Sequence, residues 1–362
     1  MIRLGGLIDT IMIKLSSKKQ KILSIFLEKG EMQSSDIHAE IIKLGEDLSL
    51  VTIKRILSGM VNDKVLIATG FGRSTSYNIT TFGRVFIEVD PHEYCSVEPD
   101  KRSGLNHYNF ELFSDFPLDI FSNEELKILE DATLQYEKRT NDLPIAIQKK
   151  ELERLIIELS WKSSKIEGNT YTLLDTEKLI LDGVEAHGHD KKEAVMILNH
   201  KEAFNFVREN SVQFKTITRK NLEDLHSILV KDLSVGLGLR KKLVGIVGSK
   251  YQPLDNIHQI SETIDSLSTT ISRMSSPYAK ALVALLGIGY IQPFEDGNKR
   301  TSRLMANAIL LAHSRAPLSY RSVDENDYRE AMLVFYELNS ILPFKKILIS
   351  QYVFAAQNYA VK

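Results

Sequence analysis

The sequence predicts a mainly helical protein with a small mixed α and β domain at its N-terminal end. From residue 122 onward, apolar residues recur at helical spacing almost throughout. Before that point, residues 16–85 show three short helical patterns followed by two short strand patterns. With 362 residues, the chain is long enough for two domains and one sizeable core.

The N-terminal patterns are short and well delimited. The helical patterns cover 16–29, 34–45 and 49–64, and the strand patterns lie on either side of a glycine-rich turn at 70–72. Gly30 ends the first helix, and Ser49 is placed to cap the third. Three helices followed by a hairpin resemble a winged helix-turn-helix, which we assign to residues 1–87.

In that family the third helix enters the major groove of DNA. The side chains in position for such a contact are Thr52, Lys54, Arg55 and Arg73. Residues 1–85 carry 12 Lys and Arg against 8 Asp and Glu, which is only a moderate positive charge. DNA binding and a protein contact, either with a target or in a homodimer, are therefore equally good predictions for this domain.

Residues 88–121 are rich in proline, aspartate, serine and glycine and show no regular period. We interpret them as a linker that packs on the next domain. Tyr94, Tyr108, Phe110 and Phe113 provide apolar surface for that packing.

Bulk composition favours a cytoplasmic protein without a membrane partner. The net charge is −1, so no global field directs the chain to nucleic acid or membrane. The single cysteine, Cys95, excludes an internal disulfide framework. The first 15 residues lack a signal-peptide pattern, and no apolar run approaches the length of a membrane span.

The stretch "QPFEDGNKRTSR", residues 292–303, carries the chemistry. It follows a helix at 277–291 that is apolar nearly all round and is therefore expected to be central and buried. Gly297 allows a tight turn, and the backbone N–H groups that open the next helix can bind an anion. Arg300 and Arg303 share one face of that helix, and guanidinium groups match phosphate oxygens. With Asp296 as a hard oxygen ligand, the pattern predicts a site for a magnesium-bound polyphosphate.

This stretch is similar to the signature of the Fic family, His-Pro-Phe-x-Asp/Glu-Gly-Asn-Gly/Lys-Arg-x-x-Arg, at every position except the first. The resemblance implies a Fic-fold helical core, which we assign to residues 122–362 with the motif at 292–303. It also implies that AMP is transferred from ATP to a hydroxyl group of a target protein.

The resemblance assigns one role to each motif residue. Asp296 would bind Mg²⁺, and Gly297 with Asn298 would form the anion hole for the α- and β-phosphates. Arg300 would hold the β-phosphate and Arg303 the γ-phosphate, while Lys299 stands where the family accepts glycine or lysine.

Residues 239–254 stand where the family has its flap, and their pattern predicts a β-hairpin. The flap would pair with an extended target segment through its backbone. The residues expected to dock the target are Leu243, Val244, Gly245 and Ile246.

A second motif concerns control. Residues 149–168 form a helical pattern whose end, from Ser163 through Glu167 to Gly168, resembles the inhibitory helix of self-inhibited Fic proteins. By that resemblance Glu167 would pair with Arg303 and occupy the γ-phosphate position, with Ser163 supporting the contact.

Gln292 replaces the histidine that accepts the proton of the attacking hydroxyl in the family. A carboxamide cannot accept that proton near neutral pH. Glu295 and Glu167 are alternative acceptors, although nothing in their spacing requires this role. Two interpretations follow: an AMP transferase weakened by Gln292, and a catalytically inactive ATP sensor whose winged helix binds DNA.

Overall fold

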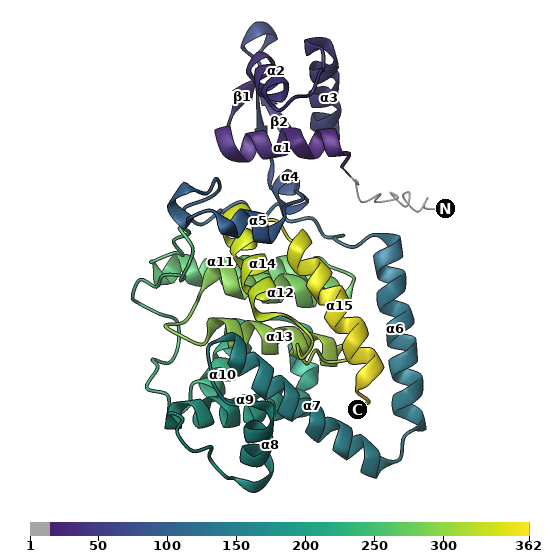
Figure 1. The fold of residues 1–362 in the computed structure, drawn as a ribbon, viewed down its shortest axis with the longest axis vertical. Coiled ribbons are helices and arrows are strands. Elements are labelled where there is room, and N and C mark those ends of the chain that lie inside the picture. Colours follow the sequence, from purple (N-terminus) through teal and green to yellow (C-terminus); the bar gives the residue numbers. More distant parts are fainter. Residues whose placement is uncertain (1–14, 362) are drawn as a thin grey trace, which may run out of the picture.

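The computed structural model describes residues 15–361. Most of the stretch used to judge a signal peptide therefore lies outside the described residues. Figure 1 shows a small N-terminal domain at one end of the long axis and a larger helical body at the other. None of the described helices is long and apolar enough to cross a membrane.

The N-terminal domain contains three helices and a small antiparallel sheet. Its elements are α1 (Ser17–Lys29), β1 (Met32–Gln33), α2 (Ser34–Lys43), α3 (Leu50–Asn62), β2 (Leu66–Thr69) and β3 (Ser76–Ile79). The strand order is β1-β3-β2. The predicted helices and hairpin are confirmed, whereas the two-residue strand β1 has no sequence pattern of its own.

The apolar periodicity of α1 and α3 produces a separate core. Ser49 caps α3 by accepting a hydrogen bond from the backbone N–H of Thr52. The fully buried side chains at the centre of this core are Ile22, Leu23, Phe26, Ile37, Ile53, Leu57 and Met60. This cluster ends near Ile87, where a second and much larger cluster begins.

The connecting segment has more structure than a linker pattern predicts. It contains α5 (Pro91–Ser96), and α4 (Thr81–Val85) directly precedes it at the end of the N-terminal domain. Tyr108 and Phe113 are buried in the large core, but Phe110 is 62% exposed, so its expected burial is wrong. Tyr108 occupies the inner position, and the Phe110 ring packs edge-on against it with centroids 5.2 Å apart.

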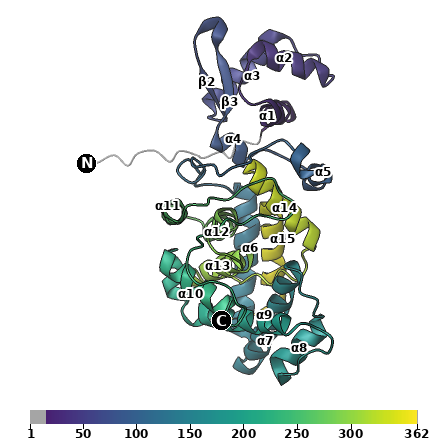
Figure 2. The ribbon, with the colours of Figure 1, turned by 90° about the vertical axis from the view of Figure 1, so that its left-hand side faces the viewer.

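The body consists of helices almost throughout. They are α6 (Asn123–Asp142), α7 (Ile145–Ile166), α8 (Leu173–Asp182), α9 (Lys191–Glu209), α10 (Arg219–Leu229), α11 (Ile257–Arg273), α12 (Pro277–Ile291), α13 (Asn298–Ala312), α14 (Glu325–Leu338) and α15 (Leu342–Asn358). α12 and α13 lie in the middle of the body in both views, and α6 runs alongside α15 (Figures 1 and 2).

The segment 239–254 is not the predicted hairpin: it contains no strand. Leu243 is 74% exposed and Val247 is also exposed, so two of the apolar residues on which the prediction depended cover no surface. Backbone hydrogen bonds to other parts of the chain hold its two ends: the Arg240 N–H donates to the Pro293 carbonyl, the Gln252 N–H donates to the Asn106 carbonyl, and a single bridge joins Gln252 to His107.

Candidate active site

The motif loop connects two buried helices. α12 begins with Pro277 after the Ser276 cap, and all but two of its residues are buried. It ends at Gln292, whose backbone is left-handed with φ 51° and ψ 59°. Gly297, with φ 79°, precedes the first residue of α13. Two left-handed residues thus bring the chain from one helix to the next within a few residues.

The side chain of Gln292 turns back onto its own helix. Its Nε2 donates to the Gly289 carbonyl at 2.6 Å, and the side chain is almost completely buried. The Gln292 carbonyl accepts a hydrogen bond from Arg240 Nε at 2.5 Å. At the position of the family's base, the structure therefore holds a neutral amide that already donates to a backbone carbonyl.

The loop is fixed by its own polar side chains. Asn298 Oδ1 accepts from the Phe294 N–H at 2.9 Å, and Asn298 Nδ2 donates to the Phe294 carbonyl at 2.8 Å. The Gly297 N–H donates to Asp296 Oδ1 at 2.6 Å. A Cβ atom at position 297 would lie only 3.0 Å from Val230 Cγ1, so the loop requires glycine for space as well as for its backbone angle.

Arg300 is a buried charge with weak compensation. Its side chain is 2% exposed, and its nearest acceptors are the Leu229 carbonyl at 3.4 Å and Asp296 Oδ2 at 3.5 Å. Burial lowers the pKa of the Arg300 guanidinium. Because a buried cation is costly without a close anion, this position favours the binding of a phosphate or another anion.

Arg303 is completely buried and closely partnered. Its Nε donates to Ser163 Oγ at 2.9 Å, and its NH2 group donates to the Ser163 carbonyl at 2.8 Å. The same NH2 atom lies 2.8 Å from Glu167 Oε1, and the guanidinium lies over the Tyr328 ring. Burial alone would lower the pKa of Arg303, but the Glu167 carboxylate outweighs it, and the pKa is raised.

Glu167 directly follows α7 and reaches the motif from a distant part of the chain. Its Oε2 also lies 3.7 Å from Lys299 Nζ. Burial raises the pKa of Glu167, but Arg303 and then Lys299 lower it more, so the carboxylate is held in its charged form. The sequence prediction that Glu167 lies against Arg303 agrees with this geometry, and Gly168 follows with φ 97°.

Asp296 is the exposed acid of the site. Its side chain is 69% accessible, and one oxygen already accepts the Gly297 N–H. Over residues 15–361, no three His, Cys, Asp or Glu side chains gather as a metal-binding group. One carboxylate beside a phosphate site fits Mg²⁺, which keeps several waters and uses phosphate oxygens as further ligands.

Two residues that the sequence did not single out complete the site. His226 Nε2 lies 2.9 Å from the Asp296 carbonyl, and its ring stacks on Phe294. Arg240, almost fully buried, donates to the carbonyls of Gln292, Lys242 and Leu254 and so holds both ends of segment 239–254 against the loop. Arg240 stands beside two exposed lysines, and nothing in the sequence distinguishes it from them.

A hollow of about 660 Å³ borders the predicted docking residues. Leu243, Val244 and Gly245 line it together with the linker residues Tyr108 and Phe110. Ile246 is half-buried and lines a neighbouring hollow of about 490 Å³.

The far end of segment 239–254 is anchored by a buried carboxylate. Glu337, on α14, accepts hydrogen bonds from Tyr94 Oη at 2.7 Å, Ser249 Oγ at 2.7 Å and Arg102 NH1 at 3.2 Å. Arg102 and Tyr94 belong to the segment that leaves the N-terminal domain. That segment therefore positions the predicted docking surface.

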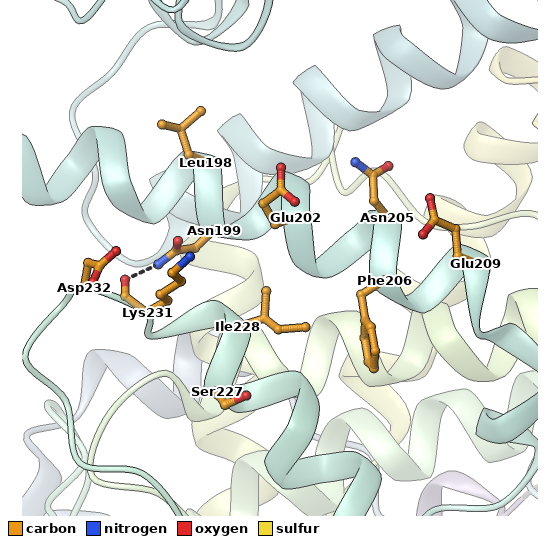
Figure 3. Close-up of a pocket in the computed structure, with 10 residues that line it drawn as sticks. All are labelled: Leu198, Asn199, Glu202, Asn205, Phe206, Glu209, Ser227, Ile228, Lys231 and Asp232. Atoms are coloured by element: carbon orange, nitrogen blue, oxygen red, sulfur yellow. Dashed lines mark hydrogen bonds between the residues drawn. The ribbon is translucent and has the colours of Figure 1, made fainter.

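Another cavity, of about 590 Å³, lies between α9 and α10, away from the motif (Figure 3). It is lined by mixed polar and apolar residues such as Glu202, Phe206 and Lys231. Asn199 closes one end by donating to the Lys231 carbonyl at 2.6 Å, as the dashed line in Figure 3 shows. None of the motif residues 292–303 lines it.

In the N-terminal domain, Lys54, Arg55 and Arg73 are exposed. Thr52 is half-buried, and its hydroxyl lies 3.0 Å from Ser49 Oγ at the start of α3. The three basic side chains are therefore free to meet a partner, whereas Thr52 contributes to the helix cap.

A model of the Fic/DOC family matches residues 216–310, a range that contains α10, segment 239–254 and the motif. Residues 216–310 are thus similar to the Fic domain. The Fic-type signature at 292–303 lies inside the range that the family model matches.

Known Fic proteins resemble a larger part of the chain. The protein adenylyltransferase Fic of Nematostella vectensis is 27% identical over 186 residues, which are 50% of this chain and 44% of that protein. The protein of the same name in Drosophila willistoni is 28% identical over 52% of this chain and 38% of its own length. The match therefore spans less than half the length of these relatives.

Two solved structures share the fold. A Fic domain containing signaling protein from Bacteroides thetaiotaomicron has a TM-score of 0.53 at 20% identity, covering 64% of this chain and 94% of that chain. Fic-1 from C. elegans has a TM-score of 0.55 at 18% identity, covering 65% and 72%. The predicted mainly helical Fic fold is confirmed.

Proposed function

We propose that this protein binds Mg-ATP at residues 296–303, transfers AMP to a hydroxyl group of a target protein, and is held inactive by Glu167. The observation that carries this proposal is the complete burial of Arg303 against Glu167 and Ser163. The adenylyltransferase relatives support the reaction type.

The triphosphate of ATP would run along α13, with its terminal phosphate farthest from the start of the helix. Arg300, with its weak contacts, would bind the β-phosphate, and Arg303, one turn further, the γ-phosphate. The Gly297 N–H and the start of α13 would face the α- and β-phosphates, with the Asn298 side chain holding the loop in shape. Lys299 adds positive charge at the entrance. Asp296 would hold Mg²⁺, which supplies charge neutralisation between the phosphates.

In the transfer step, the target hydroxyl oxygen forms a bond to the α-phosphorus while the bond to pyrophosphate breaks. The hydroxyl proton must leave, and Gln292 cannot accept it. Loss of a general base typically reduces the rate by about 10²–10⁴-fold, while positioning and phosphate electrostatics remain. We therefore propose a slow transferase, in which Gln292 fills the position of the base.

Inhibition by Glu167 follows from competition for one guanidinium. Arg303 cannot hold a carboxylate and a γ-phosphate bidentately at the same time. While Glu167 stays in place, the triphosphate tail is shifted from its productive position. Release of the C-terminal end of α7 would free Arg303.

The experiment is label transfer from ATP labelled on its α-phosphate, with Mg²⁺ and a host lysate. The unmodified chain is compared with Glu167→Gly, with and without Gln292→His. We expect Glu167→Gly to label itself or a lysate protein more strongly than the unmodified chain. Arg303→Ala in the same background is the matched control and should remove the gain. Equal labelling by Glu167→Gly and the unmodified chain would contradict the inhibitory role.

A second candidate function is an ATP-sensing regulator that binds DNA and does not catalyse transfer. The buried amide of Gln292 and the exposed basic residues Lys54, Arg55 and Arg73 favour it. This function predicts label transfer only when Gln292→His restores the base. It also predicts DNA binding that weakens steeply with salt and is reduced by Lys54→Ala and Arg55→Ala.

A further inference from the structure

His226 makes two contacts with the loop that precedes α13. Its Nε2 atom lies 2.9 Å from the Asp296 carbonyl oxygen. Its ring lies flat on the Phe294 ring, with centroids 3.7 Å apart and planes 9° from parallel. One side chain of α10 thus holds two residues of the motif loop.

The hydrogen bond defines the state of the ring. A carbonyl oxygen only accepts, so Nε2 carries the proton and donates. Burial, together with the nearby Arg300, lowers the pKa of His226 to about 4. Nδ1 is buried and without a partner among the described residues.

The same bond fixes the orientation of a peptide unit. In a planar trans peptide the C=O and the N–H point in opposite directions. Since the Asp296 carbonyl points to α10, the Gly297 N–H points away from α10, toward Asp296 Oδ1. This N–H and this carboxylate are the groups that the proposed function assigns to phosphate and Mg²⁺.

Val230 and His226 pack closely around Gly297. A Cβ atom there would lie 3.0 Å from Val230 Cγ1 and 3.5 Å from His226 Cδ2. We propose that His226 is a positioning residue that orients the Asp296–Gly297 peptide for Mg-ATP, a role that rests on the proposed function.

The test measures the affinity of the 362-residue chain for Mg-ATP by titration calorimetry, with Glu167→Gly as the background. His226→Phe keeps a flat ring on Phe294 but removes the donor, whereas His226→Gln keeps a donor of similar reach. We expect His226→Phe to weaken Mg-ATP binding about tenfold, as for loss of a buried hydrogen bond. We expect His226→Gln to stay within about threefold of the background.

The rescue by glutamine distinguishes positioning from packing. If folded His226→Phe binds Mg-ATP as tightly as the background does, the hydrogen-bond donor has no role and the inference is wrong. The inference is also wrong if folded His226→Gln binds Mg-ATP about tenfold more weakly than the background, because glutamine keeps a donor. The second comparison remains decisive even where the phenylalanine variant does not fold. If the background itself shows no binding of Mg-ATP, or binds it no better than its Arg300→Ala control, the proposed function has failed, which is a different result.

Discussion

At the scale of single residues, Arg303 has almost no capacity left for a ligand. Ser163 accepts from Nε and NH2, Glu167 lies against NH2, and NH1 is the one buried nitrogen of this group without a partner among the described residues. A γ-phosphate must therefore displace Glu167 before it can bind with two hydrogen bonds. ADP, which lacks that phosphate, does not meet this competition.

The first prediction follows from this difference. In the unmodified chain, Mg-ATP and Mg-ADP should bind with similar affinity, because Glu167 occupies Arg303. In Glu167→Gly, ATP should gain about 10- to 100-fold over ADP, as expected for a charge-assisted hydrogen-bonded pair. Titration calorimetry with both nucleotides measures the ratio. A strong preference of the unmodified chain for ATP would argue against the competition.

The charged residues of the site were predictable from the sequence where they belong to a motif. Asp296, Arg300, Arg303 and Glu167 carry charges in a recognisable order, and the structure brings them together. His226 lies 70 residues from its partner Asp296, so no local pattern marks it.

At the scale of elements, α12 is the platform of the site. Its bounds agree with the apolar pattern at 277–291, because a helix that is apolar all round must be surrounded by other elements. Segment 239–254 failed as a hairpin for the opposite reason. A strand forms only where a neighbouring strand pairs with its backbone, and no strand of the described chain pairs with this segment.

The second prediction concerns close packing on α12. A Cβ atom at Gly287 would lie 2.6 Å from Leu267 Cδ1 and 3.1 Å from Phe113 Cζ, both buried side chains. Gly287→Ala should therefore destabilise the protein by about 1–3 kcal/mol despite alanine's higher helix propensity. In α3, a Cβ atom at Gly59 would meet no packed neighbour within 4 Å among the described residues, so Gly59→Ala should stabilise by up to about 1 kcal/mol. Urea unfolding of both variants checks the opposite signs.

At the scale of the whole molecule, two hydrophobic clusters meet around residues 82–87. Few polar contacts join them. Among these, Ser340 Oγ donates to the Ile87 carbonyl at 2.7 Å. The sequence indicated this division by its change from mixed to helical patterns, although it did not indicate how the connecting segment packs.

The third prediction is that the two clusters unfold separately. Leu57 and Leu285 are both completely buried, one in each cluster. Leu57→Ala should lower the midpoint of one thermal transition and Leu285→Ala that of another, each by the equivalent of about 2–5 kcal/mol. Scanning calorimetry resolves the transitions. A single transition that both variants shift equally would show that the protein unfolds as one unit.

The buried carboxylate of Glu337 has a practical consequence for domain exchange. The stretch from Tyr94 to His107 belongs by position to the connection, yet it anchors Ser249 and pairs with Gln252. A chimera that replaced the N-terminal domain by cutting inside this stretch would also replace residues that hold segment 239–254 in place. The interchangeable module therefore ends near residue 90, and a transplanted domain should be joined there.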